Sequence, residues 1–207
     1  MAATFWGQLI KFKEVPDDQR IEVLPFLAAS KAIVVFVESL GKAFYPVKKD
    51  ISGNIEKLEK KHAMNPGKFM TFNDMLEEEL ANKSTDLATV GGLWLKRALE
   101  FIAGFLQNIA DSHYREPKEE NIRPLILAAY EPTLQRYHGW VTKKIFSAVA
   151  RAAPYRKDMM LIYSLGVEGI EDQVVKDIET YLVTMKSNLS ALSKLFIDLG
   201  LDVDGEV

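Results

Sequence analysis

Cysteine is absent from the 207 residues of the chain, and long uncharged stretches are absent as well. Without cysteine the protein has no disulfide bond and no thiolate nucleophile, a composition compatible with a reducing compartment. Pro25, Lys31, Glu38 and Lys42 interrupt the most apolar region, so no stretch reaches the ~18 residues of a membrane-spanning helix. The N-terminus lacks a basic segment before its apolar residues, which argues against a signal peptide. We expect a cytoplasmic protein whose membrane contact is peripheral and transient.

Motifs for catalysis and for metal or nucleotide binding are also missing. The sequence has no nucleophile elbow and no phosphate-binding glycine loop. Neither His62 nor His113 has a partner at metal-ligand spacing, so both are interpreted as surface residues. The acidic run 77–79 is a poor carboxylate pair, because sequence neighbours do not face each other on a helix. A formal net charge of −3 disfavours nucleic acid. We expect no enzyme, no cofactor, no metal and no nucleic-acid partner.

The periodicity of apolar residues indicates helices joined by short polar, proline or glycine breaks, and strand-like alternation is absent. A chain of this size can bury about 70% of its unfolded surface. No composition shift or internal repeat divides the sequence, so we predict one domain over 1–207. The predicted helices are 22–40, 47–63, 68–81, 86–111, 122–137, 139–152 and 171–199, with shorter helical pieces near 4–11 and 158–164.

The predicted helix 86–111 is apolar around most of its circumference. Its polar residues recur at helical spacing, whereas Trp94, Phe101 and Phe105 share one side. By pattern alone these residues are typical of a packed core. A cavity that encloses hydrocarbon would produce the same pattern, so the periodicity does not separate the two.

Three polar residues share one stripe of the predicted helix 47–63. Asp50, Asn54 and Lys57 stand at i, i+4 and i+7, so an acceptor, an amide and a cation point the same way. Asp50 and Lys57 lie roughly 10 Å apart along the axis, too far to neutralise each other directly but far enough to bracket a sugar ring. The alternative interpretation is a solvated helix face, because charged residues are common in this segment.

A second polar and aromatic group lies within 138–158. The imidazole of His138 could donate to a carbonyl while the protein holds its other nitrogen. The stretch also interleaves Trp140 and Tyr155 with Lys143 and further cations, a mixture that suits a bilayer interface. The alternatives are a structural histidine and an ordinary solvated face.

Five segments in order resemble the glycolipid transfer protein family: DISGNIEK, LWLKRALEF, RYHGW, KIFSA and APYRKD, all between positions 46 and 158. The resemblance implies an all-α fold, a two-layer helical sandwich of about eight helices. It also implies that the protein extracts one glycosphingolipid from a membrane, encloses its ceramide chains and releases it elsewhere without catalysing a reaction. We expect a monomer that binds a glycosphingolipid ligand and a membrane surface.

The resemblance also implies roles for individual residues. One set would bind the glycolipid headgroup, with the aromatic ring beneath the first sugar: Asp50, Asn54, Lys57 and Trp94. Two residues would hold the ceramide amide: His138 and Asp50. An apolar set would line the acyl chains: Val90, Phe101, Phe105 and Phe146. From the aromatic and cationic pattern of 138–158, rather than from the resemblance, we expect a further set to contact the membrane: Trp140, Lys143 and Tyr155.

Two alternatives remain open. Ceramide-1-phosphate carriers of the same superfamily are similar along much of the chain, but they need additional cations at the head site. Trp94 and the neutral Asn54 favour a sugar, whereas Lys57 and Arg97 keep a phosphate possible. A glycolipid sensor or interaction module is the second alternative. The chain closes with GLDVDGEV, which lacks the terminal aromatic residue of several relatives, so we assign the tail no site residue.

Overall fold

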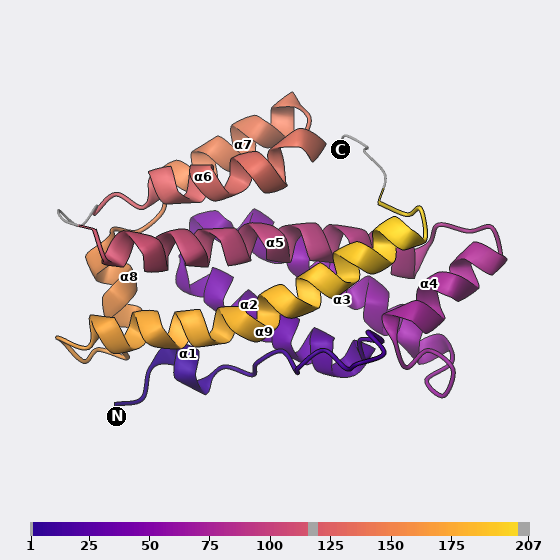
Figure 1. The fold of residues 1–207 in the computed structure, drawn as a ribbon. Coiled ribbons are helices and arrows are strands. Elements are labelled where there is room, and N and C mark those ends of the chain that lie inside the picture. Colours follow the sequence, from indigo (N-terminus) through magenta and orange to yellow (C-terminus); the bar gives the residue numbers. More distant parts are fainter. Residues whose placement is uncertain (1, 116–119, 203–207) are drawn as a thin grey trace.

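The computed structural model describes residues 2–115 and 120–202, and its regular elements within those ranges are helices, apart from two isolated β-bridges (Figure 1). The α-helices are α1 Phe5–Gln8, α2 Val23–Ser39, α3 Tyr45–Met64, α4 Phe72–Ala81, α5 Leu87–His113, α6 Arg123–Thr133, α7 Trp140–Arg151, α8 Arg156–Tyr163 and α9 Glu171–Asp198. Two short 3₁₀ helices are η1 Lys42–Phe44 and η2 Gln135–Tyr137. The all-helical prediction is confirmed, with nine α-helices in the described ranges rather than about eight.

The predicted start of α4 at residue 68 is wrong, because the helix begins at Phe72. The Thr71 hydroxyl accepts a hydrogen bond from the backbone N–H of Asp74, and the Asp74 carboxylate accepts one from the backbone N–H of Thr71. This reciprocal capping box satisfies two backbone donors and fixes the first turn at that point. The residues before Thr71 therefore belong to the preceding turn.

The predicted helix 122–137 is divided in the structure. α6 ends at Thr133, and in η2 the backbone N–H of Tyr137 donates to the carbonyl of Leu134 at 3.0 Å. Pro132 lies in the last turn of α6 and has no N–H to donate to the helical ladder, so the chain tightens there. The tighter segment leads directly to His138, which stands just before α7.

α5 is the central helix of the fold. α3 and α9 flank it, α4 contacts it, and α2 packs against α3. α6 covers a further side of α5, and α7 packs mainly against α6. The α6–α7 pair therefore forms a layer of its own, seen above the other helices in Figure 1.

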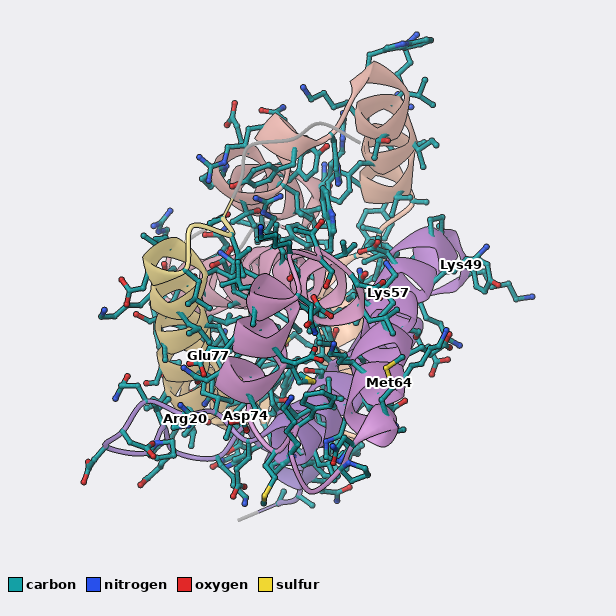
Figure 2. All side chains as sticks on the ribbon, turned by 90° about the vertical axis from the view of Figure 1, so that its right-hand side faces the viewer. Arg20, Lys49, Lys57, Met64, Asp74 and Glu77 are labelled. Carbon is teal, nitrogen blue, oxygen red and sulfur yellow. The ribbon has the colours of Figure 1, made fainter. Side chains whose placement is uncertain are left out.

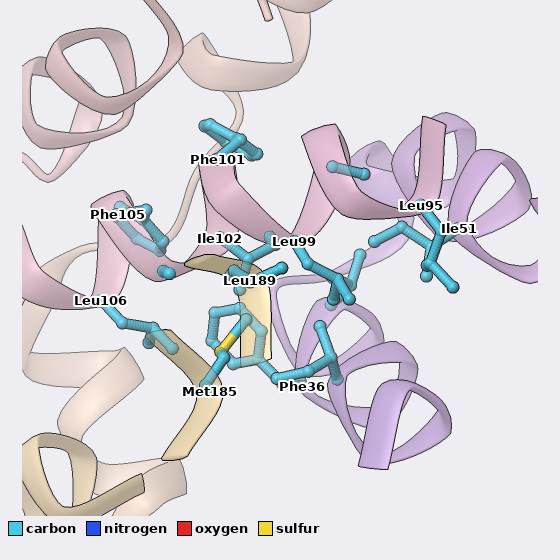
Figure 3. Close-up of a cluster of buried hydrophobic side chains, with 14 of the residues drawn as sticks. Phe36, Ile51, Leu95, Leu99, Phe101, Ile102, Phe105, Leu106, Met185 and Leu189 are labelled. Atoms are coloured by element: carbon cyan, nitrogen blue, oxygen red, sulfur yellow. The ribbon is translucent and has the colours of Figure 1, made fainter. Parts of the chain in front are cut away.

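The core lies beneath α5, between α2 and α9. Figure 3 shows Leu99 and Leu106 of α5 directed toward Phe36 of α2 and Met185 of α9. All four side chains are almost fully buried. Burial of one such side chain contributes about 1.5–3 kcal/mol, so this packing holds α5 firmly on its lower side.

A buried carboxylate holds the N-terminus of α5. Glu79 of α4 is fully buried and accepts hydrogen bonds from the backbone N–H groups of Ala88 and Thr89, each at 2.8 Å. The ammonium of Lys61 on α3 lies 3.3 Å from the same carboxylate. Burial alone would raise the pKa of Glu79, but the hydrogen bonds outweigh it and lower the pKa, so the group is ionised at neutral pH. The contact joins α3 and α4 to the start of the central helix.

Candidate functional site

The three polar residues of α3 form a hydrogen-bonded chain. The ammonium of Lys57 donates to Oδ1 of Asn54 at 2.9 Å, and Nδ2 of Asn54 donates to Oδ1 of Asp50 at 3.4 Å. The amide of Asn54 is buried, whereas the Asp50 side chain at the end of this hydrogen-bonded row is exposed to solvent. In Figure 2 Lys57 lies on the inner side of α3, whereas Lys49 points away from the molecule. The structure therefore brings Asp50, Asn54 and Lys57 together on one face.

The carboxylate of Asp50 prefers its neutral form more than an ordinary aspartate does. Although part of the side chain is open to solvent, desolvation by the surrounding protein raises its pKa. The positive charge of Lys57 and the hydrogen bond from Asn54 oppose this rise without cancelling it. A ligand that donates hydrogen bonds to Asp50 would replace the water that the carboxylate has lost. Hydroxyl and amide N–H groups fit this requirement.

Two glycines of α5 let α3 and α9 pack closely against it, beside the hydrogen-bonded residues of α3. A Cβ atom at Gly91 would come within 3.1 Å of the Asn54 carbonyl oxygen and 3.0 Å of the Lys57 Cβ atom. A Cβ atom at Gly92 would come within 2.9 Å of a ring on α9. Larger side chains at these positions would push the helices apart, so the glycines set the distance between the polar residues of α3 and Trp94, about one turn further along α5.

Aromatic rings surround Trp94. Its indole lies nearly parallel to the imidazole of His138, with ring centroids 6.3 Å apart and planes inclined by 16°. It meets the ring of Tyr137 edge to face at 6.2 Å. Both partners belong to the segment between α6 and α7, so α5 contacts that layer here. Trp94 is only partly buried, which leaves part of the indole accessible to a ligand.

The imidazole of His138 is neutral and is held through one nitrogen. Its Nδ1 atom lies 2.9 Å from the hydroxyl of Tyr130 on α6. Burial raises the pKa of Tyr130 to about 12, so the hydroxyl keeps its proton and can donate it to Nδ1. Burial, and then the nearby charge of Lys143, lowers the pKa of His138. The remaining Nε2–H group is therefore left as a donor for a carbonyl oxygen.

A pocket of about 150 Å³ lies beside these residues. Its apolar wall includes Val47, Ala98, Phe101, Leu134, Phe146 and Val149. Asp50 and His138 also line it, and they are its only ionisable residues within the described part of the chain. Polar groups thus meet an apolar interior in one pocket, which is a suitable arrangement for an amphipathic ligand.

The four residues assigned to acyl chains occupy different places. Phe101 and Phe146 line the pocket, with ring centroids 5.3 Å apart in an edge-to-face contact. Phe105 packs instead against a phenylalanine of α2, at a centroid distance of 6.4 Å. Val90 is 38% exposed near the start of α5, about 12 Å before Ala98 along the helix axis. Phe105 and Val90 lie outside the lining of this pocket, so their assignment to the acyl chains stays a prediction.

One side of α7 is exposed from end to end. Trp140 is 68% exposed at its start, with the ammonium of Lys144 4.5 Å from the indole centroid. Ile145 is 50% exposed and also lines the pocket. Tyr155 is exposed beyond the other end of α7, whereas Lys143 is partly buried. Across the described residues, no helix has the length and apolar character needed to span a bilayer.

The charged cluster at the end of α9 was not anticipated from the sequence. The Asp202 carboxylate accepts a hydrogen bond from the Arg97 guanidinium at 2.9 Å and lies 3.3 Å from the Lys96 ammonium. The guanidinium also lies 3.4 Å from the ring centroid of Tyr137 and 5.2 Å from that of Trp94. Several acidic residues occupy the C-terminal segment, and no pattern in the sequence distinguishes Asp202 among them.

The interpretation of His113 as a surface residue is wrong. Its side chain is buried, with Nε2 2.6 Å from the Asp172 carboxylate and Nδ1 3.2 Å from the Arg156 guanidinium. Arg156 is itself buried and donates to the Ser112 hydroxyl at 2.8 Å. The cluster joins α8 and α9 to the C-terminal end of α5, and none of its members lines the pocket.

Comparisons with known proteins identify the family. The family model described as Glycolipid transfer protein (GLTP) matches residues 21–164, a range that contains α3, α5 and α7. The chain belongs to this family. The glycolipid transfer protein of Danio rerio is 33% identical over 202 residues, covering 95% of this chain and 97% of the relative. The pleckstrin homology domain-containing family A member 8 of Rattus norvegicus is 32% identical over 200 residues, covering 92% of this chain but 37% of that protein.

Solved structures share the GLTP fold with this chain. The structure described as "How FAPP2 Selects Simple Glycosphingolipids Using the GLTP-fold" matches with a TM-score of 0.87 and 31% identity, covering 99% of this chain and 100% of that one. The apo form of mouse ceramide-1-phosphate transfer protein matches with a TM-score of 0.83 but 22% identity, covering 97% and 99% of the two chains. The GLTP fold thus occurs in proteins named for different headgroups, and the choice of headgroup must come from the site.

Proposed function

We propose that this member of the glycolipid transfer protein family carries one glycosphingolipid at a time between membranes, without catalysing a reaction. The observation that carries the proposal is the pocket in which Asp50 and His138 stand beside Phe101 and Phe146. Hydrogen-bonding groups at the edge of an apolar cavity suit a ligand with a polar head and hydrocarbon chains. The relatives named for glycolipid transfer support the same conclusion.

The first sugar of the headgroup binds beside α3 and α5. One face of a pyranose is apolar and its rim carries hydroxyls, so stacking on Trp94 leaves the rim to Asp50 and Lys57. Asn54 hydrogen-bonds to both of these residues and orients them. A lipid without the sugar would leave desolvated groups unpaired, at a cost of roughly 1–3 kcal/mol per group. Ordinary phospholipids are rejected on this ground.

The ceramide amide binds between His138 and Asp50, which line the same pocket. The Nε2–H group of His138 donates to the amide carbonyl oxygen, because the Tyr130 hydroxyl lies against the other ring nitrogen. The Asp50 carboxylate accepts from the amide N–H. The amide carbonyl and the amide N–H of the ceramide then each have a hydrogen-bond partner: the neutral imidazole of His138 as donor and the charged carboxylate of Asp50 as acceptor.

The hydrocarbon chains supply the affinity. Exposing them to water costs about 0.8 kcal/mol per methylene, so a long chain must be covered during transfer. The observed pocket, at about 150 Å³, is smaller than the roughly 300–1,000 Å³ of typical ligand pockets. Uptake therefore requires the pocket to widen. α7 forms one wall and packs mainly against α6, so α7 is the wall that moves.

The exposed side of α7 is the membrane contact. Trp140 stands at one end of this side and Tyr155 beyond the other, with Lys144 and Arg151 between them. Aromatic residues favour the bilayer boundary and cations favour anionic headgroups. In this proposal the protein works in the cytoplasm as a monomer. One chain holds both the head site and the pocket, so no second copy is needed to complete the site.

A ceramide-1-phosphate carrier is the second candidate, and the site favours it less. Arg97 and Lys57 are the two cations that keep a phosphate possible in the sequence. The Arg97 guanidinium is buried, donates to Asp202 and covers the ring of Tyr137, so its charge is already compensated. The charge of Lys57 acts on the Asp50 carboxylate, to which its ammonium is linked through Asn54. The head site therefore offers a phosphate little uncompensated positive charge.

Transfer of fluorescent glucosylceramide between donor and acceptor vesicles tests the proposal. With protein far scarcer than lipid, the wild type should move many lipids per molecule, because it is a shuttle. Asp50→Asn should lower the rate roughly 10- to 100-fold, as expected from losing one charged hydrogen bond. Its melting temperature should rise slightly, since the ionised carboxylate is disfavoured in the fold.

Glu56→Gln provides the matched control, because Glu56 is an exposed acid on the same helix. Normal transfer by Asp50→Asn, or equal losses in both variants, would remove Asp50 from the head site. Stable retention of one lipid by the wild type, with no turnover, would favour the sensor alternative over the carrier.

A further inference from the structure

The wall that α7 presents to the pocket is apolar except at one position. Four residues of α7 line the pocket at the helical spacing i, i+3, i+4 and i+7: Thr142, Ile145, Phe146 and Val149. This spacing places them on one stripe of the helix, and three of the four have hydrocarbon side chains. Among the described residues that line the pocket, Thr142 carries the third polar side chain, after Asp50 and His138. The proposed binding of the ceramide amide gives it no role.

The hydroxyl of Thr142 is available to a ligand. Threonine hydroxyls inside helices often donate to the carbonyl four residues earlier, and those of Thr133 and Thr180 do so at 2.7 and 2.8 Å. Thr142 makes no such bond, and within the described part of the chain its hydroxyl has no hydrogen-bond partner. The side chain is partly buried. Hydrocarbon laid over this hydroxyl would displace water without replacing its hydrogen bond, which is unfavourable.

The two residues that bind the ceramide amide in the proposed function lie on opposite walls of the pocket. Asp50 on α3 accepts from the amide N–H, and His138, just before α7, donates to the amide carbonyl. The amide nitrogen is bonded to the sphingoid base, whereas the carbonyl carbon begins the acyl chain. The acyl chain therefore starts on the α7 side of the pocket, where Thr142 follows His138 by four residues.

We propose that Thr142 selects glycosphingolipids whose acyl chain carries a hydroxyl at C2, the carbon next to the amide carbonyl. The 2-hydroxyl oxygen and the carbonyl oxygen are borne by adjacent carbon atoms. The side chains that bind them must therefore be neighbours on one wall, as Thr142 and His138 are at the start of α7. Both hydroxyls can donate and accept, so they can pair in either direction. The inference rests on the proposed function, because it names the class of lipid chosen at that same site.

Competition between two glucosylceramides in the same phosphatidylcholine donor vesicles tests the proposal. The lipids share their sphingoid base and acyl length, and only one carries the 2-hydroxyl. Mass spectrometry of the acceptor vesicles gives the ratio of hydroxylated to non-hydroxylated lipid that each variant delivers. Thr142→Val removes the hydroxyl and keeps the branched shape, so its ratio should be about 2- to 10-fold below that of the wild type, as loss of one neutral hydrogen bond provides. A purely structural role would change both lipids alike.

Thr180→Val is the matched control, since it removes an exposed threonine hydroxyl from α9, outside the lining of the pocket. Its ratio should equal that of the wild type. Thr142→Ser keeps a hydroxyl and should retain most of the wild-type ratio. A second lipid pair differs only by a hydroxyl at C4 of the sphingoid base, on the amide N–H side, and Thr142→Val should leave that ratio unchanged. Circular dichroism confirms folding, and Thr142→Ala, which also lacks the hydroxyl, replaces Thr142→Val if the latter unfolds at the assay temperature.

Four outcomes would overturn the proposal. They are an unchanged ratio in Thr142→Val, an equal fall in Thr180→Val, an equal fall in Thr142→Ser, or a fall for the base-hydroxylated pair as large as that for the acyl-hydroxylated pair. A wild-type protein that delivers neither glucosylceramide would instead contradict the proposed function. The two failures are therefore distinguishable in the same assay.

Discussion

The two sides of α5 carry equally buried side chains with different surroundings. Leu99, on the lower side, is fully buried among helices that pack on one another, as Figure 3 shows. Phe101, on the upper side, is 2% exposed but lines the pocket under α7. Burial therefore does not distinguish a core residue from a cavity wall. What distinguishes them is the covering layer, because α7 packs mainly against α6 and leaves space beneath it.

The largest expected difference concerns stability. Leu99→Ala should lower the free energy of unfolding by about 2–5 kcal/mol, because it opens a cavity in a packed core. Ile145→Ala, on the pocket wall, should cost less than about 1 kcal/mol, since half of that side chain already meets solvent. Denaturant unfolding measures both values. Equal losses would mean that the two sides are packed alike.

Enlarging one alanine on each side of α5 distinguishes a packed core from a wall of the pocket. Ala103→Leu, in the core, should cost about 1–3 kcal/mol by overpacking, with transfer per folded molecule unchanged. Ala98→Leu extends into the pocket, so it should cost less than about 1 kcal/mol and slow glucosylceramide transfer several-fold. Melting curves and the vesicle assay report the two effects. Slower transfer in Ala103→Leu alone would contradict the assignment of the pocket.

A smaller effect, on binding to vesicles, is expected from a substitution on the outer surface of the α6–α7 layer. Trp140→Ala should weaken partitioning onto vesicles about tenfold, because the exposed indole no longer enters the interface. Lipid affinity in detergent should change little. Ile197→Ala removes an exposed apolar side chain from α9 and serves as the control in a vesicle sedimentation assay. Identical partitioning of both variants and the wild type would exclude Trp140 from membrane contact.

The smallest effect is a pH dependence on the pocket side. Burial lowers the pKa of His138 below its ordinary value of 6.5, so the unfolded chain binds a proton more readily than the folded one. The neutral ring therefore contributes its full stability above the ordinary pKa of 6.5, and this contribution is lost as the pH falls through the lower pKa of the folded state. The free energy of unfolding should therefore decrease from about pH 7 to about pH 5.5 by more in the wild type than in His138→Gln. Parallel curves would assign the loss to other groups.

Most of the fold could be predicted because apolar periodicity is local information. The ends of α2, α5 and α9 follow from it within two residues. The start of α4 was missed because the apolar residues before Thr71 continue the pattern, and only the capping pair Thr71 and Asp74 reveals the boundary. The assignment of residues 1–207 to a single domain stays a prediction.

The candidate site was predictable where one element carries it. Asp50, Asn54 and Lys57 meet because helical spacing alone aligns them. The pairing of Arg97 with Asp202 spans 105 positions, and spacing says nothing over that length. Val90 and Phe105 could not be separated from Phe101 for the same reason, since the partners that decide their surroundings lie on other helices.

Ile145 belongs to two surfaces at once, the outer side of α7 and the inner wall of the pocket. On the proposed function, a bilayer against that side of α7 would place Ile145 between the acyl region of the membrane and the apolar cavity. A hydrocarbon tail that enters past Ile145 would then meet apolar surface on both sides of α7, so membrane contact and lipid uptake would be coupled at this one residue.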